Sequence, residues 1–150
     1  MDPETRFGYT REMTESEIES CLRDVGHGVL SLADGDDGYA IPLYHHYEDG
    51  RLFFRLGETA TGRKADFIET TATATYVVHE AEETPDAAVD RAWSVVARGP
   101  LEPVPEDHAA YDLAAINERF GSLRLFDEPH DQVELTLYEL RPEQLTGRQN

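Results

Sequence analysis

The strongest constraint on the fold is an alternation of apolar and polar residues with a period of two, which begins at His27. The alternating stretches are residues 27–33, 39–48 and 51–56. The segments between them are Asp34–Gly38 and Glu48–Gly50, rich in aspartate and glycine. These residues tolerate the backbone conformations that tight turns need. The pattern predicts three antiparallel strands joined by hairpins.

Two details refine this prediction. In the third stretch Leu52, Phe54 and Leu56 share one face, and the other face carries Arg51, Phe53 and Arg55. The second stretch contains Pro42, which has no N–H to donate, so we expect an edge or a bulge at that point.

A helix is predicted before the first strand. Thr14 followed by Glu17 is typical of a capping box. One apolar stripe then follows at helical spacing, and it consists of Ile18, Cys21, Leu22 and Val25. Gly26 stands where a helix ends. Because Cys21 lies on the stripe, a small core residue is a better interpretation of it than a redox centre.

The rest of the chain completes a mainly β protein. We expect a loose arm over 1–11, a short helix over 63–70, strands over 72–81, 91–104 and 132–140, a helix from Pro105 with Ala109, Leu113, Ile116 and Phe120 on its core face, and a polar tail over 142–150. The 91–104 strand should bend near Gly99-Pro100. About six strands joined mostly by hairpins predict a six-stranded antiparallel barrel, with short helices filling its gaps, as a single domain over 1–150.

Charge sets further limits. The chain has 31 acidic and 13 basic residues, a net charge of −18, and Lys64 is its one lysine. Such a surface repels phosphates, so nucleic-acid binding is not expected. The sequence has no apolar run long enough for a membrane span and no visible secretory signal, so we expect a cytoplasmic protein. Spread acids with almost no lysine favour a salty cytoplasm over an ordinary acidic protein, because salt screens the repulsion.

Two cations stand where a helix should begin, in Gly62-Arg63-Lys64. The positive end of a helix dipole disfavours cations, and a bound anion resolves that conflict. A phosphate there collects backbone N–H groups and both charges, with Arg55 as a third. The alternative is a solvated pair facing acids such as Glu58 or Asp66.

The remaining candidates are aromatic residues and histidines. Trp93 could border an aromatic ligand or be a core residue, and Ser94 points to the opposite face. His45 and His46 are adjacent on a strand and point to opposite faces, so they do not suit one metal ion, and we expect no metal site. The sequence shows no nucleophile elbow and no phosphate-binding glycine loop of the common kinds.

Three motifs together resemble the pyridoxamine 5′-phosphate oxidase-like family, the FMN-binding split barrels, and most closely their short branch of 5-nitroimidazole-resistance proteins. The motifs are the hairpin YAIPLYHHYEDGRLFF, the segment GRKADFI and the strand WSVVARG. The similarity runs from about Arg11 to Gly99. It implies a homodimer of six-stranded split β-barrels with FMN at two sites on the subunit interface.

Carried over by position, the resemblance also implies site residues. Gly62, Arg63 and Lys64 would hold the FMN phosphate, assisted by Arg55. The residues beside the flavin ring, partly through backbone groups, would be Leu43, Tyr44 and His45, and Trp93 and Ser94 would contribute from a neighbouring strand. Short relatives usually have a small polar residue, an aromatic and a small residue where this chain has Tyr44, His45 and His46. The ending Leu140-Arg141-Pro142 departs from the Arg-Leu-x-Pro run of the vitamin B6 oxidases, which argues against pyridoxamine-phosphate oxidase activity.

The first functional hypothesis is therefore an FMN-dependent oxidoreductase that passes electrons to a small acceptor, with NAD(P)H as one possible donor. His45 either donates a proton or has a structural role, and no catalytic residue is assigned. The alternative is a non-catalytic module that binds flavin, another phosphate-bearing ligand or haem. A third hypothesis is a flavin-free interaction protein.

Overall fold

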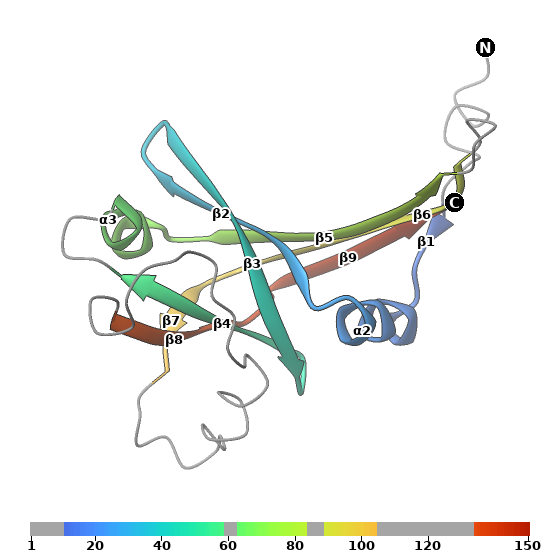
Figure 1. The fold of residues 1–150 in the computed structure, drawn as a ribbon, viewed down its shortest axis with the longest axis horizontal. Helices are drawn as coiled ribbons and strands as arrows, with labels where there is room; N and C mark the ends of the chain where they lie inside the picture. Colours follow the sequence, from blue (N-terminus) through green and yellow to red (C-terminus); the bar gives the residue numbers. More distant parts are fainter. Residues whose placement is uncertain (1–10, 59–62, 84–88, 105–133) are drawn as a thin grey trace.

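The computed structural model describes residues 11–58, 63–83, 89–104 and 134–150 (Figure 1). Within them the chain forms two helices, α2 (Glu15–Asp24) and α3 (Arg63–Thr70), and nine strands. The strands are β1 (Arg11–Glu12), β2 (His27–Asp34), β3 (Asp37–Glu48), β4 (Arg51–Glu58), β5 (Ala74–Glu83), β6 (Val89–Gly99), β7 (Leu101–Pro103), β8 (Glu134–Leu140) and β9 (Gln144–Gln149). Gly62 and the helix expected from Pro105 lie outside the described residues.

All strand pairs are antiparallel, in the order β1-β9-β6-β5-β2-β3-β4-β8-β7. The long strand β3 belongs to two parts of this sheet. Its first part pairs with β2 in the larger half, which runs from β1 to β3, and its last residues pair with β4 in the smaller half, which runs from β3 to β7. Figure 1 shows β3 crossing between the two halves.

The two halves also meet on the far side, through two bent strands. β6 continues into β7 past Pro100, and β8 continues into β9 past Arg141. At this crossing a Cβ on Gly99 would come within 2.0 Å of the Arg141 carbonyl oxygen, so only glycine fits. If each bent pair counts as one strand, the described sheet has six strands besides the two-residue β1. The predicted antiparallel split barrel and the bend near Gly99 are thus confirmed.

The polar tail predicted over 142–150 is wrong for most of its length. Residues Gln144–Gln149 form β9, which pairs with β6 on one side and β1 on the other. The buried residue of this strand is Gly147, which gives no apolar signal in the sequence. A Cβ there would come within 2.7 Å of Met13 Sδ, so the missing side chain makes room for the core. Arg11, the last residue of the expected arm, instead belongs to β1, and residues 1–10 of that arm lie outside the described residues.

The hairpin predictions hold with shorter turns. β2 and β3 pair from His27↔Tyr44 to Asp34↔Asp37, which leaves a two-residue turn with Gly35 at a φ of +60°. The turn from β3 to β4 has Asp49 and Gly50 both at positive φ, as hairpin turns of this type require.

The prediction at Pro42 is also confirmed. Pro42 pairs with Val29 of β2, while the pairing of β3 with β4 covers only residues 45–48. Its missing N–H therefore falls where β3 has a partner strand on one side only.

Phe53 departs from the predicted alternation, because it was placed on the polar face of its strand yet has no exposed surface. It lies opposite Glu139 of β8, which is itself 5% exposed. Glu139 forms ion pairs with Arg51 (3.3 Å) and Arg141 (2.9 Å). The outward face of the smaller half is thus buried at this point, and the arginines compensate the carboxylate that burial would otherwise penalise.

Helix α2 begins as predicted. Thr14 caps it, and the backbone and side-chain bonds of a capping box with Glu17 are both present. Ile18 and Leu22 are buried in the core between the two halves. Burial of this stripe, more than helix propensity, stabilises a helix of ten residues.

Candidate functional site

The candidate site residues of β3 point alternately to the two faces of the strand. Leu43 and His45 point into the barrel and are 4% and 7% exposed. Tyr44, between them, points outward and is 41% exposed. Of these three residues, then, only Tyr44 offers its side chain to a ligand outside the barrel.

Tyr44 lies at the fork, the point where β3 parts from β4 beyond the pair His45↔Phe54. Arg55 is the next residue of β4, on the same outward side as Tyr44, and it is half-buried opposite Leu137 of β8. Across the other neighbour, β2, His27 pairs with Tyr44, and the two rings meet edge to face with centroids 6.4 Å apart. The fork therefore has Tyr44 in contact with His27, and Arg55 lies on the same outward side across the parting strands. Sequence reasoning missed His27 because a single histidine has no spacing pattern.

Helix α3 starts at the predicted place. Its first two residues are Arg63 and Lys64, at the end where the helix dipole is positive. The helix is fixed against the barrel at its other end. Thr71 Oγ1 accepts the Ala33 N–H of β2 at 3.0 Å, and the Phe67 ring stacks on Tyr39 with centroids 5.1 Å apart.

Trp93 and Ser94 occupy opposite faces of β6. Trp93 is 8% exposed and belongs to the core, and Ser94 is half-buried on the outward side. Two strands, β2 and β5, separate β6 from β3. At the usual strand spacing Ser94 is about 14 Å from Tyr44. One copy of the chain therefore does not bring Ser94 to the fork.

Ser94 belongs to a broad outer face on the larger half. On β3, β2, β5, β6 and β9 three rows of outward residues cross this face: Ala40, Pro42 and Tyr44 of β3, His27, Val29 and Ser31 of β2, Thr75, Val77 and His79 of β5, Ser94, Val96 and Arg98 of β6, and Gln144, Thr146 and Arg148 of β9. None of these fifteen residues is acidic, although the chain has 31 acidic residues, and the acidic residue beside them is Glu12 of the edge strand β1, opposite Arg148. The central row consists of Pro42, Val29, Val77, Val96 and Thr146. We call all of these outward residues, in the central row and on either side of it, the acid-free face.

The buried imidazole of His45 makes two hydrogen bonds. Nε2 lies 2.8 Å from the Leu22 carbonyl oxygen of α2, and Nδ1 lies 2.7 Å from the Tyr76 hydroxyl of β5. Because a carbonyl only accepts, Nε2 carries the proton and Nδ1 accepts from Tyr76. Burial lowers the pKa of His45, and the neighbouring His27 and His46 lower it further. Both ring nitrogens are thus engaged within the protein.

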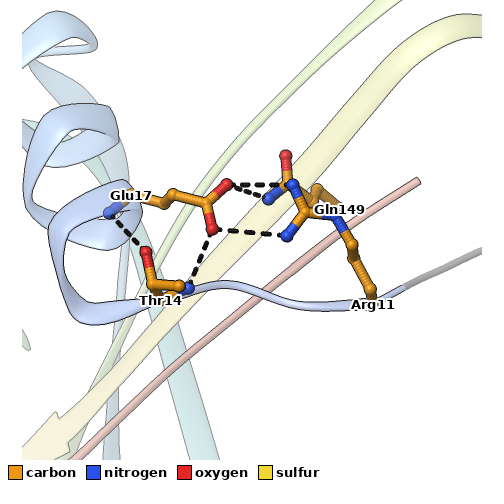
Figure 2. A network of polar contacts seen from close by, with 4 residues as sticks. All are labelled: Arg11, Thr14, Glu17 and Gln149. Carbon is orange, nitrogen blue, oxygen red and sulfur yellow. Dashed lines mark hydrogen bonds and ion pairs between the residues drawn. The ribbon is translucent and has the colours of Figure 1, made fainter.

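At the other end of α2 a carboxylate collects several donors (Figure 2). Glu17 accepts the Thr14 backbone N–H at 3.0 Å, the Arg11 guanidinium at 3.1 Å and the Gln149 side-chain amide. These bonds, the one from Thr14 first, lower the pKa of Glu17 from 4.5 to about 2. The carboxylate joins β1, α2 and β9.

In the described part of the chain, no three or more His, Cys, Asp and Glu side chains are grouped so that they could hold a metal ion. None of its helices has the length and apolar character needed to cross a membrane.

Comparison with known proteins gives the family. The family model described as pyridoxamine 5′-phosphate oxidase matches residues 14–149. A search of curated proteins found no match.

Solved structures of the same fold include a FAD-binding protein of Mesorhizobium loti, with 20% identity over 94% of this chain and 98% of that chain and a TM-score of 0.71. A proposed 5-nitroimidazole antibiotic resistance protein of Bacteroides thetaiotaomicron has 17% identity over 93% and 87%, with a TM-score of 0.70. A FAD and heme binding protein of Mycobacterium smegmatis has 14% identity over 93% and 72%, with a TM-score of 0.63. At these identities the likeness shows the fold.

Proposed function

This chain belongs to the pyridoxamine 5′-phosphate oxidase family, and from that premise we propose that it binds FMN and is an oxidoreductase that passes electrons to a small acceptor. Several solved proteins of the same fold are named for the FAD that they bind. FMN is the narrower proposal for this chain, because the cations at α3 suit a terminal phosphate.

The observation that carries the proposal is the start of α3. Arg63 and Lys64 are its first two residues, and the strand before it carries Arg55 outward beside Tyr44. A helix N-terminus with two cations supplies N–H donors and positive charge to a phosphate. In a chain of net charge −18, this placement of its one lysine supports an anionic ligand.

The residues fit FMN in part. Gly62, Arg63 and Lys64 would bind its phosphate, and Arg55 would add charge from β4. The ring would lie outside β3, against the Tyr44 side chain and the backbone of Leu43 and His45. The side chains of Leu43, His45 and Trp93 lie in the barrel and would shape the site only indirectly. When bound, the flavin ring supplies hydride acceptance and electron transfer, and the protein fixes its position and limits access.

Ser94 takes part in such a site only if a second copy provides it, since one chain holds it about 14 Å from Tyr44. We therefore include a homodimer, with FMN at the subunit interface, in the proposal. The proposal further includes NAD(P)H or another small molecule as electron donor and a salty cytoplasm, and the acid excess supports the last of these.

Titration of FMN into the purified protein in molar salt tests the proposal, with flavin fluorescence as the readout. Arg63→Ala and Lys64→Ala should each weaken binding, by up to about 1.5–3 kcal/mol for a charge-assisted contact. Arg23→Ala is the matched control, because Arg23 lies on α2 over the Tyr47 ring. A protein that takes up no FMN, FAD or riboflavin would overturn the flavin proposal, and unchanged affinity in both variants would overturn the phosphate assignment.

A second candidate is a flavin- or haem-binding module without turnover. It is favoured by His45, whose two ring nitrogens are both bonded inside the protein and are not available to a substrate. Addition of NAD(P)H to the flavin-loaded protein separates the two candidates. Bleaching of the flavin absorbance supports the oxidoreductase, and an unchanged spectrum with a range of donors supports the module.

A further inference from the structure

His45 joins three parts of the molecule. The residue sits on β3, its Nε2–H donates to Leu22 of α2, and its Nδ1 accepts from Tyr76 of β5. Its backbone N–H also donates to the Gly26 carbonyl at 2.9 Å, in the segment that links α2 to β2. The backbone of β3 at this residue is therefore held both through the side chain and through the main chain.

The bond to Leu22 has a reason in the helix itself. The last four carbonyls of a helix lack partners within it. Helix α2 ends at Val25 in an extended conformation, and the Val25 N–H reaches only the Cys21 carbonyl. His45 supplies the donor for the next carbonyl, that of Leu22. A strand residue thus completes the end of the helix.

The Tyr76 hydroxyl has a second acceptor on the same strand segment. It lies 3.4 Å from the Leu43 carbonyl oxygen as well as 2.7 Å from His45 Nδ1. Leu43 and His45 flank Tyr44, so the core fixes both neighbours of the outward ring. These buried contacts therefore fix the position of Tyr44 at the fork.

We propose that His45 is a positioning residue for the site at the fork. As a neutral ring protonated on Nε2, it holds residues Leu43–His45 between α2 and β5 and so sets the position of Tyr44. A second proton, on Nδ1, loosens that hold. The inference rests on the proposed function for its effect on a ligand. The hold itself rests on the two hydrogen bonds and the burial of the ring.

Burial of the ring opposes the protonation of His45 and lowers its pKa, and the nearby titratable groups on β2 and β3, His27 and His46, lower it further. From α2 the Leu22 carbonyl accepts from Nε2–H, which raises the pKa, and from β5 the ring meets the Tyr76 hydroxyl. A proton on Nδ1 would turn that acceptor into a donor, and Tyr76 would have to turn its O–H to the more distant Leu43 carbonyl. Protonation would therefore remove a hydrogen bond that fixes the segment Leu43–His45, which carries Tyr44.

Two substitutions separate the two bonds. In His45→Gln the amide nitrogen can occupy the place of Nε2 and keep the bond to Leu22, without a titrating group. In His45→Asn the amide oxygen can occupy the place of Nδ1 and keep the bond from Tyr76, but the side chain is too short for Leu22. His79→Gln is the matched control, since that histidine is exposed on the outward face of β5.

The first readout is hydrogen exchange of the His45 and Val25 amides in the ligand-free full chain, expressed as protection relative to intrinsic exchange. We expect wild-type protection to fall between about pH 8 and about pH 5, because His45 accepts a proton more readily in the opened segment than in the closed one, where burial lowers its pKa. His45→Gln should keep its protection over this range, His45→Asn should have low protection at both ends, and His79→Gln should behave as the wild type.

The second readout is FMN affinity at the same two pH values. The phosphate of FMN itself titrates near pH 6, so each variant is compared with the wild type and not one pH with the other. From the higher to the lower pH, the affinity for FMN should fall roughly fivefold more in the wild type than in His45→Gln. This difference is the equivalent of one lost hydrogen bond.

The outcomes are distinct from those of the proposed function. Unchanged protection in the wild type across this range, or the same loss in His45→Gln, overturns the positioning role even if FMN binds. Protection that responds as expected in a protein that binds no flavin supports the hold and overturns the proposed function. Protection that responds while FMN affinity changes equally in all variants overturns the link to the site.

Discussion

The two ends of α2 are held to the barrel by opposite chemistry. At its start an exposed carboxylate, Glu17, must be charged to collect its donors from Thr14, Arg11 and Gln149 (Figure 2). Near its end a buried imidazole, His45, must be neutral to make both of its bonds. The first contact faces water and ions, and the second is shielded from both. The same helix should therefore respond to salt at one end and to protons at the other.

The largest effect is expected from His45→Ala. The substitution leaves a cavity and removes the buried partners of the Leu22 carbonyl and the Tyr76 hydroxyl, so unfolding should become easier by about 3 kcal/mol. Urea unfolding in molar salt measures the change. A loss no greater than that of a surface substitution such as His79→Ala would show that the buried end of α2 contributes little.

Tyr76→Phe should have a smaller effect, about 1–2 kcal/mol, because only the partner of His45 Nδ1 is lost. Combined with His45→Ala in a double-mutant cycle, the two losses should be clearly less than additive, since they break one shared hydrogen bond. Additive losses would mean that the 2.7 Å contact between Tyr76 and His45 is not stabilising.

The dependence of stability on pH should separate the two ends. The pKa of His45 is lowered below 6.5 by burial, so the unfolded chain binds the proton more readily and stability should fall as pH drops below about 6.5. The pKa of Glu17 is lowered from 4.5 to about 2, so its contribution is present above 4.5 and is lost between 4.5 and about 2. Unfolding free energies of wild type and His45→Gln as a function of pH test this, and curves that coincide near pH 6 would contradict it.

The smallest effect is expected from Glu17→Gln. The amide can still accept the Thr14 N–H, but it loses the charge that attracts Arg11 at 3.1 Å. Because this pair is exposed, salt screens it, and the difference from the wild type should shrink from low salt to molar salt. Urea midpoints at the two salt levels measure the difference. For His45→Ala the destabilisation should be the same at both, and a salt dependence there would remove the contrast between the two ends.

The elements with a regular pattern were predictable from the sequence. The hairpins from His27 to Leu56 alternate visibly, and the capping residues mark the start of α2. The last strand, β9, was not predictable, because its buried position is Gly147, which carries no side chain to reveal it. The burial of Phe53 was missed for a different reason, since local alternation does not reveal that a strand is covered on both faces.

The candidate site was predictable as a set of segments and less so as a set of side chains. The start of α3 at Arg63 and Lys64 followed from their place after a strand and loop, and a parity argument correctly put His45 and His46 on opposite faces. Which face points inward depends on the whole barrel. For that reason the inward place of His45 and the pairing of His27 with Tyr44 emerged only from the assembled fold.

The acid-free face gives the molecule an uneven electric field. An anion that diffuses toward a chain of net charge −18 is repelled from most directions, but least toward the acid-free face, which carries Arg98 and Arg148. Its rate of association should therefore rise with ionic strength less steeply than the total charge implies, because the approach that succeeds is governed by the local potential. Productive collisions of this strongly acidic protein would then come mainly from one side.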